Sequence, residues 1–273
     1  MPLDAFALAL AAAVVHALWN MLTARAVESQ VAAGVALAIG AVAFAPVAAL
    51  TWDVRAGAVP YIVASSALEL AYLAMLATAY QRAPLSVVYP VARGTAPVLV
   101  LAISVLVLGA SLPAAAIGGV LAVGTGVVLV RGSSRGARGT VLGLGVAVCI
   151  AGYTLVDKAG LDHASAIAYL DLVMLPTAAI YLAVAAALRG PRALVAELRG
   201  PTVLAGLGMF GAYALALAAL ARAEAAPVAA VRESSVVIAT ALAAVVLHER
   251  VERRRWAGAV LVVAGVAAIA LAG

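Results

Sequence analysis

Cysteine, charge and long polar segments are all scarce in this chain of 273 residues. The single cysteine, Cys149, cannot form a disulfide within the chain, and it is interpreted as a small packing side chain. Charged residues make up 11% of the chain and hydrophobic residues 67%, against about 25% and about 45–50% in soluble domains. A soluble fold of this size could not bury so much apolar surface. The composition therefore excludes a soluble domain and predicts an all-α integral membrane protein.

Several motifs of enzymes are absent as well. The sequence has no phosphate loop of the form GxxxxGK(S/T), and neither HExxH nor CxxC occurs. These absences argue against ATP as the direct source of energy and against an intramembrane metal enzyme. We therefore expect no enzyme activity, no cofactor and no metal site.

What the chain does contain is a series of apolar blocks. Each block has about 17–25 residues, the length of helix that crosses about 30 Å of hydrocarbon. Segments rich in Gly, Pro and Arg separate the blocks, and none exceeds about fourteen residues, so no soluble domain is expected. The ten predicted transmembrane helices cover residues 5–24, 31–50, 60–80, 84–108, 112–130, 139–157, 164–188, 202–221, 226–247 and 255–272.

The basic residues are concentrated in alternate loops. Loops are numbered here by the helices that they join. The odd loops hold twelve Lys and Arg residues and the even loops hold three, Arg55, Lys158 and Arg222. The positive-inside rule then places the odd loops in the cytoplasm and both termini outside. This distribution indicates that the net charge of +5 reflects insertion in a lipid bilayer and not binding of nucleic acid.

The two halves of the chain repeat each other. At an offset of 139 residues, residues of the first half fall on identical ones in the second: Arg93 on Arg232, Leu108 on Leu247, Gly119 on Gly258 and Gly126 on Gly265. At an offset of 134, Trp19-Asn20 falls on Tyr153-Thr154. Because each unit has five helices, the second copy enters the membrane from the opposite side. We predict two inverted five-helix repeats, residues 1–130 and 139–273, joined by a basic loop at 131–138.

Ionisable side chains at bilayer depth cost at least about 2.5–3.5 kcal/mol and are functional candidates by default. Glu69 lies near the middle of the third block, and Arg93 lies in the fourth block between Pro90 and Pro97. Other polar and aromatic side chains share faces with them or follow the same pattern. The expected substrate-binding residues are Trp19, Asn20, Tyr72, Tyr89, Arg93, Tyr153 and Arg232. The expected ion-coupling residues are His16, Glu69 and Glu233, with Glu69 as partial counter-ion of the two arginines.

Structural interpretations of these residues stay open beside the functional ones. Arg232 is shallow enough to extend toward the headgroups, and Arg93 could form a purely structural pair with Glu69. His16 could be a hydrogen-bonded packing residue, and Trp19 could belong to the aromatic belt. Four further charged residues are placed at the membrane interface, where water solvates them: Asp157, Lys158, Asp162 and His163. Asp171 is left undecided.

One glycine pattern is a false lead. Gly206, Gly208 and Gly211 satisfy the dinucleotide-binding pattern GxGxxG, but they lie inside an apolar block with no strand before them. They are interpreted as small residues that let helices approach closely, like Gly139 and Gly143 or the series Gly118, Ala122 and Gly126.

Five segments of the chain carry a recognisable pattern: His16–Asn20 (HALWN), Tyr89–Pro97 (YPVARGTAP), Val231–Ser235 (VRESS), His248–Arg250 (HER) and Trp256–Gly258 (WAG). Together they resemble the EamA-type family of the drug/metabolite transporter superfamily. The resemblance implies ten helices around a central cavity, in two inverted halves of four helices plus one. It also implies cytoplasmic termini, against the charge count. Two positions depart from the family pattern: residues 109–111 lack the acidic residue that Glu249 supplies in the second half, and Ala24 stands where relatives often carry Lys.

The resulting prediction is a secondary transporter of small metabolites, such as amino acids, that works by alternating access as an exporter. It would lie in a bacterial plasma membrane as a multi-pass protein, with a small-molecule substrate and a proton as the candidate coupling ion. A homodimer is left open. The alternatives are an exporter of drugs or other cationic compounds, and a membrane scaffold subunit that transports nothing.

Overall fold

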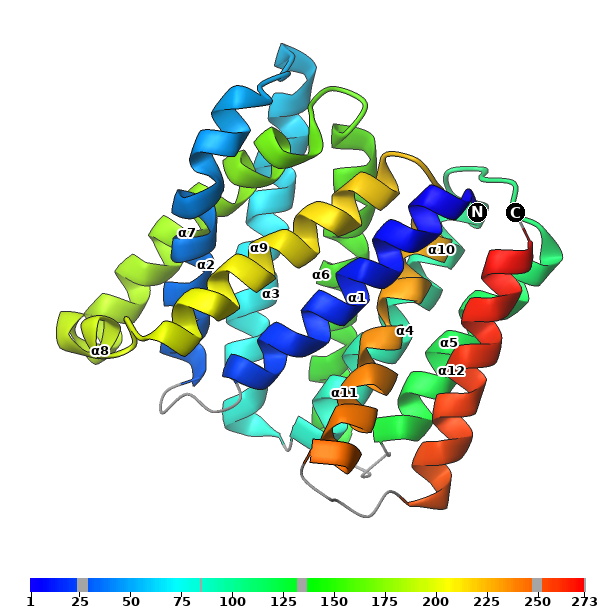
Figure 1. Cartoon of the computed structure of the whole chain (residues 1–273). Helices are drawn as coiled ribbons and strands as arrows, with labels where there is room; N and C mark the ends of the chain where they lie inside the picture. The colour runs from blue at the N-terminus through cyan, green and yellow to red at the C-terminus, as the bar shows by residue number, and fades with distance from the viewer. Residues whose placement is uncertain (24–28, 84, 132–136, 247–251, 273) are drawn as a thin grey trace.

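The computed structural model describes residues 1–23, 29–83, 85–131, 137–246 and 252–272. The helices form one bundle, with the N- and C-termini close together at the same end (Figure 1). In chain order the elements are α1 (Leu3–Thr23), α2 (Ser29–Leu50), the short 3-10 helix η1 (Ala56–Ala58), α3 (Val59–Arg82), α4 (Leu85–Leu106), α5 (Ala114–Arg131), α6 (Ala137–Gly160), α7 (Ala166–Arg189), α8 (Pro191–Ala196), α9 (Gly200–Leu220), α10 (Ala225–Arg232), α11 (Ser234–Val246) and α12 (Arg253–Leu271).

The predicted all-α membrane fold is confirmed, but the count of ten spans is not. In the described residues nine helical segments are long and apolar enough to cross a membrane, and a tenth, Ala114–Val130, is shorter because α5 begins only after Pro113. The ninth predicted block is two helices, since α10 ends at Arg232 and α11 begins at Ser234. Mid-helix side chains such as Val63, Val148 and Val263 are exposed, as in helices that face lipid.

The helices of the first five blocks pack on those of the last five in an exchanged pattern. α5 packs on α12 and α2 packs on α7. α1 packs on α9 and α3 packs on α6, while α4 contacts α6 and α1 contacts both α10 and α11. In the two halves α1 corresponds to α6, α2 to α7, α3 to α9, α4 to α10 and α11, and α5 to α12. When each helix is replaced by its counterpart, the α1–α9 contact becomes the α6–α3 contact, and the α5–α12 and α2–α7 contacts are unchanged. This is the pattern expected of two inverted repeats. The repeat boundaries stay a prediction, and most of the linking loop 131–138 lies outside the described residues.

Glycines set the distance between α5 and α12. A Cβ atom on Gly126 would lie 2.8 Å from the Gly258 carbonyl oxygen, and one on Gly119 would lie 2.7 Å from the Gly265 oxygen. On α9, a Cβ atom on Gly206 would collide with the backbone of Ala36 on α2. The packing interpretation of the GxGxxG segment is therefore confirmed at Gly206.

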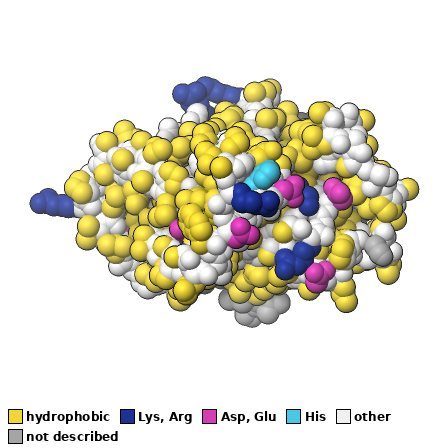
Figure 2. Space-filling model, turned by 90° about the horizontal axis from the view of Figure 1, so that it is seen from above, with side chains coloured by type: hydrophobic (Ala, Val, Ile, Leu, Met, Phe, Trp, Pro, Cys, Tyr) yellow, Lys and Arg dark blue, Asp and Glu magenta, His cyan; other side chains and the backbone are white. Residues whose placement is uncertain are grey.

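At the end of the bundle that carries the termini, two loops from different halves are joined through their backbones. Val54 and Ala164 form an isolated antiparallel bridge, Arg55 N donates to His163 O at 2.9 Å, and the Tyr61 and His163 rings stack at 5.6 Å. Asp162 is exposed, as expected of an interface residue. Viewed from this end, charged side chains gather near the middle of a mainly hydrophobic surface (Figure 2).

Candidate functional site

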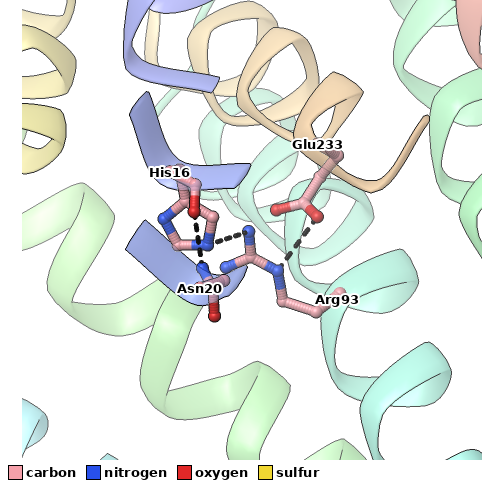
Figure 3. A network of polar contacts seen from close by, with 4 residues as sticks. All are labelled: His16, Asn20, Arg93 and Glu233. Carbon is pink, nitrogen blue, oxygen red and sulfur yellow. Dashed lines mark hydrogen bonds and ion pairs between the residues drawn. The ribbon is translucent and has the colours of Figure 1, made fainter. Parts of the chain in front are cut away.

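A buried ion pair joins the two halves at the centre of the bundle. Arg93 on α4 is 9% exposed and Glu233 is 4% exposed. Arg93 Nε lies 3.0 Å from Glu233 Oε2, as an ion pair without a straight hydrogen bond (Figure 3). Tyr72, Tyr89 and Tyr153 are electrostatic neighbours of Arg93. The predicted substrate residues of α3, α4 and α6 are therefore grouped around this arginine.

Glu233 lies at the break between α10 and α11. Its N–H bonds to Ala230 O at 3.0 Å and its carbonyl accepts from Val236 N at 3.0 Å, both as tight three-residue turns. Breaks of this kind occur inside membrane proteins where the backbone is covered by protein or lines a cavity. The break places the Glu233 carboxylate toward Arg93 rather than along an uninterrupted helix face.

His16 on α1 completes this first centre. Its Nε2 lies 3.3 Å from Arg93 Nη2, and Asn20 Nδ2 donates to the His16 carbonyl at 2.7 Å (Figure 3). Because a guanidinium can only donate, Nε2 of His16 is the acceptor and the ring is neutral in this arrangement. The Trp19 ring meets the His16 ring edge to face at 5.0 Å, and a Cβ on Gly208 of α9 would lie 3.0 Å from the Trp19 Cβ. Trp19 thus packs between α1 and α9.

A second centre surrounds Asp157 of α6, which is 1% exposed. Three hydroxyl groups from three other helices donate to its carboxylate. Ser65 Oγ lies 2.6 Å and Tyr169 OH lies 3.0 Å from Oδ1, and Tyr213 OH lies 2.6 Å from Oδ2. The carboxylate therefore ties α3 of the first half to α6, α7 and α9 of the second.

Glu69 and Arg232 flank this second centre. Glu69 is 7% exposed, and Asp157 and Arg232 are its charged neighbours. The Arg232 guanidinium lies over the Tyr213 ring, 5.6 Å from its centroid. Aromatic contacts at 6.1 Å link Tyr213 to Tyr153 and Tyr153 to Tyr72, so the two centres are continuous.

Residues 137–271 match the model of the EamA-like transporter family. The chain belongs to this family. It is accordingly a multi-pass membrane transporter, as the resemblance implied. A solved structure titled "Crystal structure of protein" shares the fold, with a TM-score of 0.76, 22% identity, and coverage of 98% of this chain and 99% of that chain. Among curated proteins no match was found.

Two expectations for this EamA-like protein are wrong. The carboxylate paired with Arg93 is Glu233 and not Glu69, because the break after α10 turns Glu233 toward α4. Asp157 is not solvated at the interface, because α6 continues to Gly160 and α3, α7 and α9 cover it. Lys158 is also partly buried and donates to Leu220 O at 2.7 Å.

The structure also places two further charged residues of the sequence analysis. Arg232 is partly buried and lies over the Tyr213 ring. Asp171 is buried, 6% exposed, and its Oδ1 has no hydrogen-bond partner among the described residues. The HER segment, residues 248–250, Glu249 included, and Ala24 lie outside the described residues.

The sequence analysis missed Asp157, Tyr169 and Tyr213 as members of the site. A usable signal existed for Asp157, because it lies four residues after Tyr153 and so shares its helix face. Tyr169 and Tyr213 are isolated tyrosines in apolar blocks, and no spacing pattern connects them with Asp157.

Proposed function

We propose that this EamA-like protein is a secondary transporter of small metabolites such as amino acids, and that it exports them by alternating access across a bacterial plasma membrane. The observation that carries the proposal is that both buried charged centres take side chains from both halves. A movement of one half against the other would change both centres at once. Inverted-repeat transporters bind substrate near the midplane where the repeats meet.

The chemistry of the two centres suits a zwitterion. Arg93 could bind a carboxylate in competition with Glu233, through the two-pronged geometry that guanidinium offers. The Tyr153 and Tyr213 rings and the carboxylates near Arg232 would accept an ammonium group. A substrate with both charges separated by a short carbon skeleton would contact both centres.

A second candidate, export of cationic compounds, is favoured by the charge balance of the second centre. Two carboxylates, Glu69 and Asp157, face one arginine, Arg232, beside three linked tyrosine rings. This excess of acidic groups would accommodate an organic cation without a carboxylate.

The first experiment is a thermal-shift screen of the purified protein in detergent against amino acids, purines, sugars and cationic drugs. Compounds that raise the melting temperature are then tested for counterflow in proteoliposomes. We expect zwitterionic amino acids to stabilise the wild type and Arg93→Ala to abolish that shift, while Arg222→Ala, at an exposed position, keeps it. If cationic drugs alone stabilise the protein, the second candidate replaces the first. If no amino acid and no cationic drug stabilises the protein or undergoes counterflow, both proposed substrate classes fail.

A further inference from the structure

One edge of the Arg93 guanidinium is divided between two partners. The Nε and Nη2 atoms form this edge, on which a single carboxylate can accept two parallel hydrogen bonds. Here Glu233 Oε2 lies 3.0 Å from Nε, and His16 Nε2 lies 3.3 Å from Nη2 (Figure 3). The Nε–H group of Arg93 makes no hydrogen bond within the part of the chain that the structure describes, although it is paired in charge. The two-pronged geometry of this edge is therefore not used by one carboxylate.

Charge matching makes Glu233 and a substrate carboxylate alternatives at Arg93. Arg93 is 9% exposed and Glu233 is 4% exposed, so water screens their charges poorly. Two carboxylates beside one buried guanidinium would leave an unmatched negative charge, and a guanidinium without a carboxylate would leave an unmatched positive one. One carboxylate at a time is therefore the stable arrangement.

The Glu233 carboxylate has no equivalent in the first half. At an offset of 139 residues, Gly94 falls on Glu233, and a Cβ on Gly94 would lie 2.9 Å from the Gly124 carbonyl oxygen. The first half is thus packed too closely at this position for a side chain. α4 is also a continuous helix from Leu85 to Leu106, whereas Glu233 lies at the break between α10 and α11. The two halves together therefore offer one buried guanidinium edge with one replaceable carboxylate.

We propose that Glu233 occupies the carboxylate-binding edge of Arg93 in the empty transporter, and that the carboxylate of the substrate replaces it there in the loaded one. Arg93 then has one carboxylate in both forms, so its buried charge is matched in the empty as well as the loaded protein. The replacement also removes a tie between α4 of the first half and the helix break of the second. Such a site favours substrates with a carboxylate over cations without one. The transport part of this proposal rests on the proposed function, whereas the binding of a free carboxylate at Arg93 does not.

The binding of a free carboxylate can be tested without a substrate. Glu233→Ala removes the atoms of one acetate ion from beside Arg93, and sodium acetate is the probe. We expect acetate to raise the melting temperature of this variant in detergent by about 2–4 °C relative to sodium chloride at the same concentration. Acetamide, which has the same shape without the charge, should not do so. Neither Glu224→Ala, at an exposed position, nor Glu233→Ala combined with Arg93→Met should respond to acetate.

A Glu233→Ala protein that acetate does not stabilise would overturn the proposal, and so would an equal response to acetamide or in the double variant. If Glu233→Ala does not fold, Glu233→Asp keeps the charge on a side chain that is one methylene shorter. Acetate should then stabilise Glu233→Asp more than the wild type, and equal responses of these two proteins would overturn the proposal.

Transport in proteoliposomes tests the role of Glu233 in the empty form. The probe is the amino acid that gives the largest thermal shift in the screen. Glu233→Gln should raise the ratio of exchange to net efflux at least about tenfold, because only the empty form then lacks its carboxylate. An unchanged ratio would contradict this role.

The two sets of results separate this proposal from the proposed function. If acetate stabilises Glu233→Ala but no amino acid is bound or transported, the carboxylate site stands and the proposed function fails. If amino acids undergo counterflow in the wild type but acetate stabilises none of the Glu233 variants, the transporter stands and the replacement of Glu233 is wrong.

Discussion

The arginines Arg93 and Arg232 occupy corresponding positions in the two halves, yet their surroundings differ. Arg93 is buried and lies 3.0 Å from the carboxylate of Glu233, with His16 on its other side. Arg232 is partly buried and lies over a tyrosine ring, with two carboxyls as electrostatic neighbours. The first arginine is held in place, whereas the second has alternative partners within reach.

The surroundings of the two arginines differ because the acidic side chain near each arginine comes from the other half. Glu233 follows Arg232 directly in the second half, but it pairs with Arg93 of the first. Glu69 belongs to the first half, but it neighbours Arg232 of the second. Repeated sequences therefore provide the positions of the arginines, and residues outside the repeat pattern make one centre a fixed pair and the other adjustable.

The largest effect is expected from Glu233→Gln. This change leaves the buried Arg93 without its carboxylate, and breaking a buried pair costs about 3–5 kcal/mol. The free energy of unfolding, measured in detergent, should fall by that amount. The double variant Arg93→Met with Glu233→Met should regain most of the stability while transport of a ligand from the screen remains lost. A Glu233→Gln protein as stable as the wild type would show that the pair is not important for folding.

Asp157→Ala, in the centre that Arg232 flanks, should have the next largest effect on the free energy of unfolding. Three hydroxyls, two of them in buried contacts and that of Tyr213 partly buried, lose their common acceptor, and at about 1 kcal/mol net for each bond the loss is about 3 kcal/mol. Asp162→Ala serves as the control, since that side chain is exposed in the adjoining loop. Equal melting temperatures for the two variants would contradict the assignment of Asp157 to a buried network.

Where the arginines differ, the glycines between α5 and α12 should behave alike. Gly119→Ala and Gly258→Ala, at repeat-related positions, each place a Cβ 2.7 Å or less from one or more backbone atoms of the other helix. Both should cost about 1–3 kcal/mol through overpacking, and by similar amounts. Gly118→Ala, where a Cβ would meet no atom within 4 Å, is the matched control. A clearly different loss of stability in Gly119→Ala and Gly258→Ala would show that the two positions are not equivalent in the packing of α5 on α12.

The smallest effect is expected from Arg222→Ala. Its Nε lies 3.3 Å from Asp4 Oδ2, and both side chains are largely exposed. Exposed pairs contribute about 0–1 kcal/mol. A larger loss of stability would mean that the exposed Arg222–Asp4 pair stabilises the fold as the buried Arg93–Glu233 pair does, and would contradict the contrast between them.

The sequence predicted the all-α membrane fold and most members of the site, because apolar blocks and intramembrane polar residues are local signals. Glu69, Arg93, Arg232 and Glu233 were all identified in this way. The identity of the partners was not predictable, since Arg93 and Glu233 lie 140 residues apart and a helix face does not specify its neighbour. Asp157 was misplaced because its block seemed to end there. The break at Glu233 also escaped prediction, since the flanking residues continue a helical pattern.

The difference between the two arginines is tested most directly by two double-mutant cycles on the free energy of unfolding, at neutral pH. One cycle combines Arg93→Met with Glu233→Gln, and the other combines Arg232→Met with Glu69→Gln. The account predicts a coupling of about 1–3 kcal/mol for the first pair, whose charged atoms lie 3.0 Å apart, and less than about 0.5 kcal/mol for the second, because the Arg232 guanidinium lies over the Tyr213 ring. Equal couplings, or a stronger coupling between Arg232 and Glu69, would contradict it.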